Sequence, residues 1–296
     1  MTARACALAA LCLAGACRRA TEPAAPAAGA AAPRVASLAP SLTEIVCALG
    51  AGDRLVGRTD VCNFPPNATA RIPIIGSFGK PFLESLLAQR PTDVIEVDLE
   101  DESVTDLFDR LGIAHHRIPC QRLADIPPAI RMVGRIVGRN AQAEALAEAL
   151  AAGLAAHRTA VARTPAAGRP LVFVTVWWDP LMTVGRSAFI SEVVDLAGGR
   201  NLGDVLPRDY NTISPEWVLE RNPDVILCLT PGTPGSAQAR LAGRAGWREL
   251  RAVRNDRVLD GFDLDILSRP GPRVLAAIDQ LSRALTNAAN RQAVTP

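Results

Sequence analysis

The chain has 296 residues, which is enough for two domains of ordinary size. Its 32 lysine and arginine residues nearly balance its 30 acidic residues, so the net charge is only +2 and no basic block stands out. This balance gives no electrostatic support for nucleic-acid binding.

The N-terminus has the pattern of an export signal. Arg4 precedes an apolar run, Ala5 to Ala16, that is too short to span a bilayer. The Ala-Gly-Ala-Cys ending resembles a bacterial lipobox, in which Cys17 would be lipidated, although Ala14 stands where leucine is usual. We predict a lipoprotein-type signal at 1–17 and a periplasmic or cell-surface protein that meets the membrane only through a lipid anchor. A simple cleaved secretory signal is the alternative.

Residues 18–33 are rich in Ala, Pro and Gly and predict a disordered tether. An N-terminal α/β lobe is predicted at 34–138 because short apolar strands alternate with helical patterns. Strands are expected at 34–38, 55–58, 74–76, 94–97 and 115–118, and helices at 42–49, 83–90, 104–111 and 126–138. Ser41 and Glu44 have the spacing of a capping box at the start of the first helix.

A long helix is predicted at 139–164. Leu146, Leu150 and Leu154 recur every four residues among alanines, and only Gly153 interrupts the pattern. At 1.5 Å per residue, the roughly twenty-three residues of its continuous helical pattern, about 141–163, reach about 35 Å, which is enough to cross from one domain to another.

A C-terminal α/β lobe is predicted at 169–290, with strands at 171–176 and 257–259 and a last helix at about 272–287. Two segments of the first lobe recur here in the same order: 43–50 matches 191–198, and 81–97 matches 214–229. The repeat predicts two related lobes with mainly parallel sheets. The alternative is coincidence, because helix–proline–strand units are common in α/β proteins.

Five of the scarce aromatic residues fall at predicted loops and strand ends: Phe78, Trp177, Trp178, Tyr210 and Phe262. Loops after parallel strands gather at one edge, where ligands bind, so these side chains suit a flat, largely apolar ligand. One of the two adjacent tryptophans is expected to fill the core instead. The three histidines are not placed to form a metal cage, and the adjacent His115 and His116 are expected to divide into one buried and one exposed residue.

Two glutamates open the repeated helices, Glu84 and Glu216. An acid in a first helical turn is favoured by the helix dipole and needs no function. Equivalent placement on two lobes would also present a pair of acidic knobs to a basic partner. Cys62 and Cys120 each follow a predicted strand, and whether they form a disulfide stays open.

Several ordered motifs together resemble the ABC-transporter solute-binding proteins of the iron-siderophore, haem and cobalamin type, and especially the cobalamin-binding branch. They are Val35-Ala36-Ser37-Leu38-Ala39-Pro40-Ser41-Leu42-Thr43-Glu44, Asn63-Phe64-Pro65-Pro66, Gly76-Ser77-Phe78-Gly79 with Leu83-Glu84, Ser214-Pro215-Glu216 and Asn222-Pro223-Asp224-Val225-Ile226. The chain departs from the branch at Val61, where an aromatic residue is frequent, and at Tyr210, where Trp occurs.

The resemblance implies two α/β lobes joined by one long helix, with a ligand cleft between them. It implies a non-catalytic, monomeric receptor that delivers a corrinoid to an ABC permease dimer with its ATPase and needs no cofactor of its own. Glu84 and Glu216 would dock into arginine pockets of the permease. Phe78, Trp177, Trp178, Tyr210, Phe262, Asp263 and Arg269 would contact the ligand. The open alternatives are a haem or ferric-siderophore receptor of the same family, a metal-ion receptor, and an exported α/β hydrolase.

Overall fold

The computed structural model describes residues 32–230, 232 and 235–290. The predicted signal at 1–17 with Cys17, and nearly all of the predicted tether, lie outside these residues. The described residues from Pro33 onward belong to one compact unit. Within the described part of the chain, no helix is both long enough and apolar enough to cross a membrane.

The first sheet has the strand order β4-β3-β2-β1-β5-β6, and its neighbours are parallel except for β3 and β4. Its strands are β1 (Val35–Ser37), β2 (Leu55–Thr59), β3 (Ile74–Ser77), β4 (Lys80–Pro81), β5 (Asp93–Glu96) and β6 (Ala114–Arg117). Its helices are α1 (Pro40–Ala48), α2 (Pro66–Thr69), α3 (Leu83–Ala88), α4 (Val104–Arg110) and α5 (Ile126–Ile136). Short 3₁₀ turns lie at Gly52–Arg54 and Leu123–Asp125.

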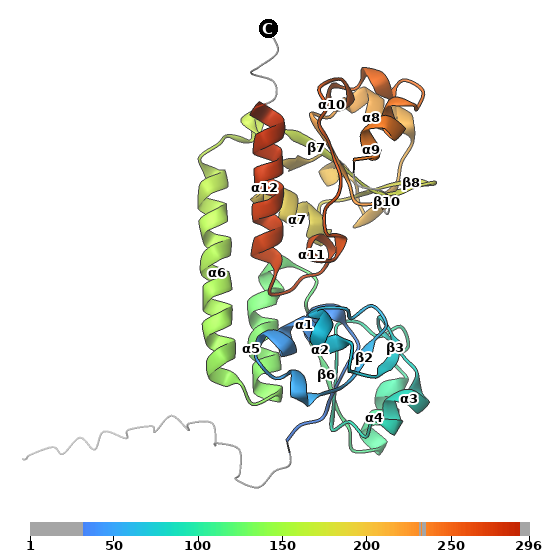
Figure 1. The fold of residues 1–296 in the computed structure, drawn as a ribbon, viewed down its shortest axis with the longest axis vertical. Coiled ribbons are helices and arrows are strands. Elements are labelled where there is room, and N and C mark those ends of the chain that lie inside the picture. Colours follow the sequence, from blue (N-terminus) through green and yellow to red (C-terminus); the bar gives the residue numbers. More distant parts are fainter. Residues whose placement is uncertain (1–31, 231, 233–234, 291–296) are drawn as a thin grey trace, which may run out of the picture. The chain divides into compact units, whose positions relative to one another are not determined.

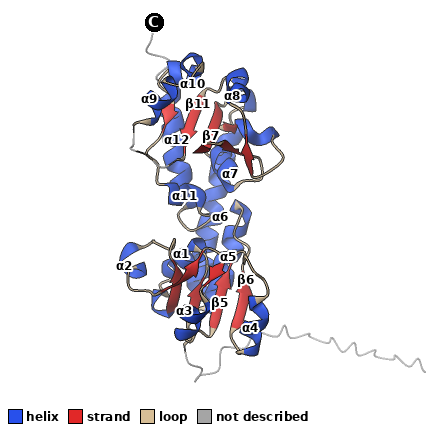
Figure 2. Cartoon of the chain, turned by 90° about the vertical axis from the view of Figure 1, so that its right-hand side faces the viewer, coloured by secondary structure: helices blue, strands red, loops and turns tan. Residues whose placement is uncertain are grey.

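Alternate residues of these strands face opposite helical layers, as the pleat of a strand requires. Val35 and Ile95 pack in the cluster that includes α1 and α5, whereas Ala36 and Val94 pack with residues of α3 and α4. Figure 2 shows the helices on both sides of the strands. Both faces of the sheet are therefore covered at its centre, where β1 is buried throughout.

The second sheet has the order β10-β8-β7-β11-β12, with β9 also paired to β7. Its strands are β7 (Leu171–Trp178), β8 (Leu181–Val184), β9 (Arg200–Asn201), β10 (Tyr210–Thr212), β11 (Val225–Cys228) and β12 (Val258–Leu259). Its helices are α7 (Phe189–Leu196), α8 (Pro215–Arg221), α9 (Ala237–Ala242), α10 (Arg251–Arg254), α11 (Leu264–Ser268) and α12 (Val274–Asn290). Further 3₁₀ turns lie at Ala166–Gly168, Leu202–Val205 and Trp247–Glu249.

The two sheets share one topological core. β1 lies between parallel neighbours β2 and β5, and β7 pairs in parallel with β9 and β11. Along the chain, α1 lies between β1 and β2, and α7 lies between β7 and β9. The predicted α/β class with mainly parallel sheets is confirmed; the antiparallel strands β8 and β10 are additions that the sequence pattern did not reveal.

The long helix α6 (Asn140–Ala162) has 23 residues. It packs along α5 of the first lobe and contacts α7 and α12 of the second, as Figure 1 shows. Its length of about 35 Å is therefore shared between the two lobes. The lobe boundaries at 34–138 and 169–290, with the linking segment at 139–164, remain predictions within this single compact unit.

Three local expectations are corrected or resolved by the side chains. The predicted capping box at Ser41 is wrong, because α1 begins one residue earlier, at Pro40. Proline suits the first helical position. The cap residue is therefore Ala39, and it makes no side-chain hydrogen bond to the helix. The histidines do not divide into one buried and one exposed residue, because both are partly buried and each contacts a carboxylate of β5. Cys62 and Cys120 are free buried thiols, and burial raises the pKa of Cys120 to about 12.

Candidate ligand-binding site

A cavity of about 600 Å³ lies between the two lobes. Segments 40–41, 78, 97 and 120–122 contribute from the first lobe, and 187–189, 209–210 and 268–270 from the second. A volume of this size is within the usual range for small-molecule sites. Because both lobes contribute to its walls, the cavity is the natural candidate for the ligand site.

The first lobe reaches the cavity through segments that follow its parallel strands. Pro40 and Ser41 follow β1, Phe78 follows β3, and Cys120 to Arg122 follow β6. Parallel strands place their carboxyl ends at one edge of a sheet, and this edge is where open α/β sheets bind ligands. The sequence expectation for Phe78 rested on the same rule.

The second lobe supplies its wall through the β8–α7 turn and the strand β10. The Gly185 amide donates to the Asp209 carbonyl at 2.8 Å, which ties this turn to the residue before Tyr210. A side chain at Gly185 would collide with the backbone carbonyl of Arg208, so the close approach requires glycine. These backbone contacts hold Tyr210 at the cavity.

The two aromatic side chains of the cavity come from different lobes. Phe78 is 53% exposed and Tyr210 is 52% exposed, although both are large and partly apolar. Burial, and then the charge of Asp209, raise the pKa of Tyr210, which therefore stays a neutral phenol. Two such surfaces on facing lobes can bind a flat ligand between them.

Arg269 lines the cavity, but its guanidinium is already engaged by the protein. Nη1 donates to Asn63 Oδ1 at 2.7 Å and Nη2 to the Val61 carbonyl at 3.0 Å. Nη2 also lies 2.6 Å from an Asp265 carboxylate oxygen. The side chain is only 13% exposed, so its first role is to hold this part of the cavity wall together.

Arg122 and Asp209 also line the cavity, and neither was singled out from the sequence. Arg122 follows β6, so the rule that places ligands at strand carboxyl ends was the signal that could have found it. Its Nε and Nη2 donate to Glu192 of the second lobe at 2.9 and 2.6 Å. Asp209 precedes the edge strand β10, which the sequence pattern did not predict.

Four predicted ligand contacts lie outside the lining of this cavity. Trp177 is exposed, and its indole N–H donates to the carbonyl of Asp179. Trp178 packs on the core of the second lobe, and the Arg240 guanidinium lies over its ring. Phe262 is partly buried against the main core. Asp263 accepts a hydrogen bond from the Asp265 amide at the start of α11.

Glu84 and Glu216 occupy equivalent positions in the two lobes. Both are exposed and lie in the first turn of a short helix, α3 or α8. α3 precedes β5 and α8 precedes β11, and these strands are equivalent neighbours of β1 and β7. The structure thus places this pair of glutamates at matching surface positions, one on each lobe.

The fold is that of a known class of binding proteins. The chain belongs to the periplasmic binding protein family, whose model matches residues 35–262. The resemblance seen in the sequence is therefore confirmed at the level of the family. Solute-binding proteins of this class bind and carry a ligand outside the cytoplasm.

Two curated relatives cover most of the chain. The vitamin B12-binding protein of Pectobacterium carotovorum subsp. carotovorum is 30% identical over 259 residues, which are 86% of this chain and 88% of the relative. The uncharacterized ABC transporter substrate-binding lipoprotein YvrC of Bacillus subtilis is 25% identical over 257 residues, 85% of this chain and 79% of YvrC.

Solved structures show the same fold with different ligand names. The periplasmic heme-binding protein RhuT from Roseiflexus sp. RS-1 in apo form has a TM-score of 0.76 at 27% identity, covering 88% of this chain and all of RhuT (100%). The periplasmic vitamin B12 binding protein BtuF of Vibrio cholerae has a TM-score of 0.72 at 28% identity, covering 87% and 98%. These relatives are named for solute binding, and their ligands differ.

Proposed function

We propose that the chain captures a corrinoid in the cavity between its lobes and delivers it to the permease of an ABC importer, without catalysis. The observation that carries this proposal is the pair of exposed aromatic side chains, Phe78 and Tyr210, on the two walls of one cavity. A corrin macrocycle offers a broad face to such surfaces. The names of the vitamin B12-binding relatives support the same ligand class.

The charges around the cavity favour a ligand with an amide periphery. Arg269 is engaged by Asn63, Val61 and Asp265, and Arg122 by Glu192, so both lining arginines already have protein acceptors. Asp209 adds a negative charge to the wall. A corrinoid carries carboxamides around its ring, whereas haem carries carboxylates that would compete for the same arginines.

Haem or a ferric siderophore is the second candidate. The likeness to RhuT and the phenol of Tyr210 in the cavity favour it, because tyrosinate is a known haem ligand. The exported-hydrolase alternative gains nothing from the relatives, which are named for binding.

The ligand is tested by calorimetric titration of the purified chain with cyanocobalamin and, separately, with haemin. We expect saturable cyanocobalamin binding with one site per chain, and weaker or no specific haemin binding. Phe78→Ala should weaken cyanocobalamin binding by about 10- to 100-fold, since burying such a side chain contributes about 1.5–3 kcal/mol.

Phe82→Ala is the matched control for the aromatic contact. Phe82 belongs to the same lobe and is similarly exposed, at 48%, but it does not line the cavity. Its substitution should leave the affinity unchanged. Tighter binding of haemin than of cyanocobalamin would transfer the assignment to the second candidate, and equal losses in both variants would refute the role of Phe78.

Delivery to the importer requires contacts outside the cavity. We propose that Glu84 and Glu216 bind basic pockets on the two permease subunits, one from each lobe. We also propose a monomer held at the membrane by lipidated Cys17. The equivalent, exposed placement of the two glutamates supports the first of these proposals.

A further inference from the structure

The first helices of the two lobes carry a second pair of matching glutamates. Glu44 lies in α1 and Glu192 in α7, within the repeated segments 43–50 and 191–198. Each follows a buried hydroxyl residue, Thr43 or Ser191. The proposed ligand contacts and docking residues do not include this repeated pair, so its contacts need an explanation of their own.

Glu44 reaches from the first lobe to two arginines of the second. Arg273 donates through Nε to Glu44 Oε2 at 2.8 Å and through Nη2 to Oε1 at 2.7 Å. Arg269 Nη1 lies 3.4 Å from Oε1. The Glu44 side chain is only 3% exposed, so this bidentate pair is shielded from water. We call Glu44, Arg269 and Arg273 the Glu44 clasp.

The Glu44 clasp also fixes the loop after β2. The Arg273 guanidinium carbon lies 3.8 Å from the centre of the Phe64 ring, and Asn63 Nδ2 donates to Asp265 Oδ2 at 2.8 Å. Together with the Arg269 contacts to Asn63 and Val61, these bonds join segment 61–64 to the α11–α12 region. A connected network of polar contacts therefore holds the loop after β2 of the first lobe against α11 and α12 of the second.

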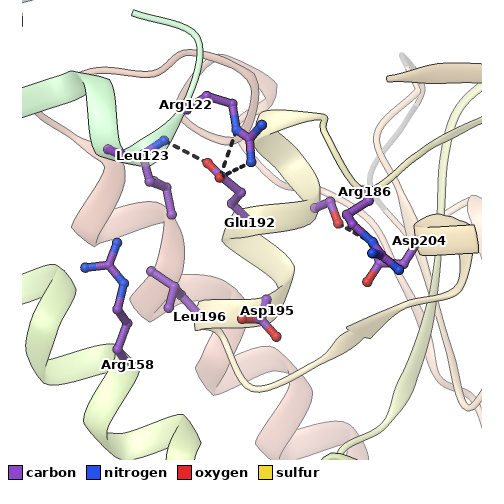
Figure 3. A pocket seen from close by; sticks show the side chains of 10 residues that line it. Arg122, Leu123, Arg158, Arg186, Glu192, Asp195, Leu196 and Asp204 are labelled. Carbon is purple, nitrogen blue, oxygen red and sulfur yellow. Dashed lines mark hydrogen bonds and ion pairs between the residues drawn. The ribbon is translucent and has the colours of Figure 1, made fainter. Parts of the chain in front are cut away.

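Glu192 makes the reverse connection, from the second lobe to the first. Figure 3 shows Arg122 and Leu123 turned toward its carboxylate. Arg122 donates through Nε and Nη2 to Oε1, at 2.9 and 2.6 Å, and the Leu123 amide donates to Oε2 at 2.8 Å. The Glu192 carboxylate therefore accepts all three of these hydrogen bonds from the first lobe. We call Glu192, Arg122 and Leu123 the Glu192 clasp.

Both clasps border the ligand cavity. Arg269 belongs to the Glu44 clasp and Arg122 to the Glu192 clasp, and both side chains line the cavity wall. We propose that Glu44 and Glu192 are positioning residues: the two reciprocal clasps, together with α6, set the separation of the lobes and so keep the cavity preformed. The effect on affinity rests on the function proposed above, whereas the effect on lobe geometry does not.

The physical reason is that the two clasps act in addition to the covalent crossing at α6 and to a hydrogen bond from Cys120 Sγ to the Pro270 carbonyl at 3.1 Å. Attachments at several points restrict both bending and twisting between the lobes. A ligand that meets a preformed cavity spends no binding energy on orienting its walls. If the clasps are removed, only a fraction of molecules holds the competent geometry, and the apparent association constant falls to that fraction of its native value.

The test measures lobe geometry directly in the full chain. Spin labels attached to ketone-bearing amino acids at the positions of Asp109 in α4 and Ala239 in α9 report the distance between the lobes by pulsed electron resonance. We expect one narrow distribution for the native chain and a broad one for Glu44→Gln with Glu192→Gln. Glu148→Gln, an exposed glutamate of α6, is the matched control and should keep the narrow distribution.

The same variants are titrated with cyanocobalamin. We expect the double variant to bind about tenfold more weakly and its distance distribution to narrow again at saturation. Circular dichroism of the unliganded variant should stay native, because a loss of stability would show there as an unfolded fraction that the ligand also reverses. If Glu44→Gln does not fold because Glu44 is buried, Glu192→Gln alone tests the proposal, because the Glu192 clasp is more exposed. Its distance distribution should then be broader than that of the native chain.

A folded Glu192→Gln variant with the native distance distribution would overturn the proposal. If the native chain bound no cyanocobalamin, the corrinoid assignment would fail while the distance measurement still judged the clasps. A broadened distribution in the Glu148→Gln control would also count against the clasps, because lobe geometry would then depend on any loss of a glutamate.

Discussion

Trp247 is fully buried, and its environment makes it a sensitive probe of the second lobe. Its ring lies edge-on to Phe173, with 6.2 Å between the ring centroids, and the Arg244 guanidinium carbon lies 5.5 Å from the centre of the Trp247 ring. Its indole Nε1 has no hydrogen-bond partner among the described atoms. The side chain therefore contributes through packing and not through a hydrogen bond.

We predict that Trp247→Ala lowers the free energy of unfolding by about 3–5 kcal/mol, the usual cost of removing a large buried aromatic side chain. Trp247→Phe should cost much less, because it keeps most of the packing and removes an unbonded N–H. Urea unfolding followed by circular dichroism measures both. Equal costs for the two variants would contradict the packing explanation, because Trp247→Phe keeps most of the packing that Trp247→Ala removes.

At the level of single residues, the sequence located the cavity better than it located side-chain partners. Phe78 and Tyr210 were predicted from strand-end placement and do line the cavity. The role of Arg269 was not accessible in this way, because its contact with Glu44 joins residues 225 positions apart. Local pattern carries no information on which lobe supplies the partner of a buried charge.

The contact between α5 and α6 depends on a glycine. A Cβ built on Gly134 would collide with the Cβ of Ala143, which cannot move without moving its helix. The two helices therefore approach more closely than any larger residue at position 134 would allow. This close approach aligns the N-terminal half of α6 with the first lobe.

Gly134→Ala should destabilise the chain by about 1–3 kcal/mol through overpacking, although alanine is the better helix former. Gly153→Ala in α6 is the comparison, because its new Cβ would meet only the mobile end of the Leu275 side chain. Thermal unfolding should rank Gly134→Ala as the less stable variant. The reverse order would mean that α5 and α6 can separate at little cost.

Most elements were predictable because their sequence periods were strong. The strands β2, β5 and β6 and the helices α4, α5, α6 and α12 lie within a few residues of their expected ranges. The hairpin of β7 and β8 was missed because the apolar pattern was read only to Val176, whereas β7 continues through Trp178 and pairs with Leu181. Short edge strands such as β9 and β10 depend on their neighbours more than on their own composition.

At the scale of the whole molecule, the docking role proposed for Glu84 and Glu216 predicts that transport can be lost without loss of binding. We predict that Glu84→Ala with Glu216→Ala keeps the ligand affinity of the native chain and abolishes uptake in cells that depend on the importer. Both side chains are exposed and lie outside the cavity lining, so the ligand does not meet them. Calorimetry measures the affinity and growth on limiting corrinoid measures the uptake.

Glu148→Ala is the control for this experiment, because Glu148 is exposed on α6 and should affect neither quantity. Loss of ligand affinity in the Glu84 and Glu216 double variant would contradict the division of roles. Normal uptake in that variant would remove the two glutamates from the docking surface.

The two-lobe arrangement followed from internal repetition, and repetition could not specify the ligand. The same strand and helix order supports receptors named for heme and for vitamin B12. What differs between such receptors are the side chains on the loops at the cavity, and these loops carry no periodic pattern. The fold was therefore predictable from the sequence, whereas the cargo depends on contacts that a binding experiment must establish.

All strands of the first sheet precede α6 in the chain, and all strands of the second follow it. The polypeptide consequently passes between the lobes a single time. During synthesis or export, the leading lobe can form its sheet and the helices around it while the rest of the polypeptide is still emerging. Folding can thus proceed vectorially, with the finished first half and α6 serving as a template for the second.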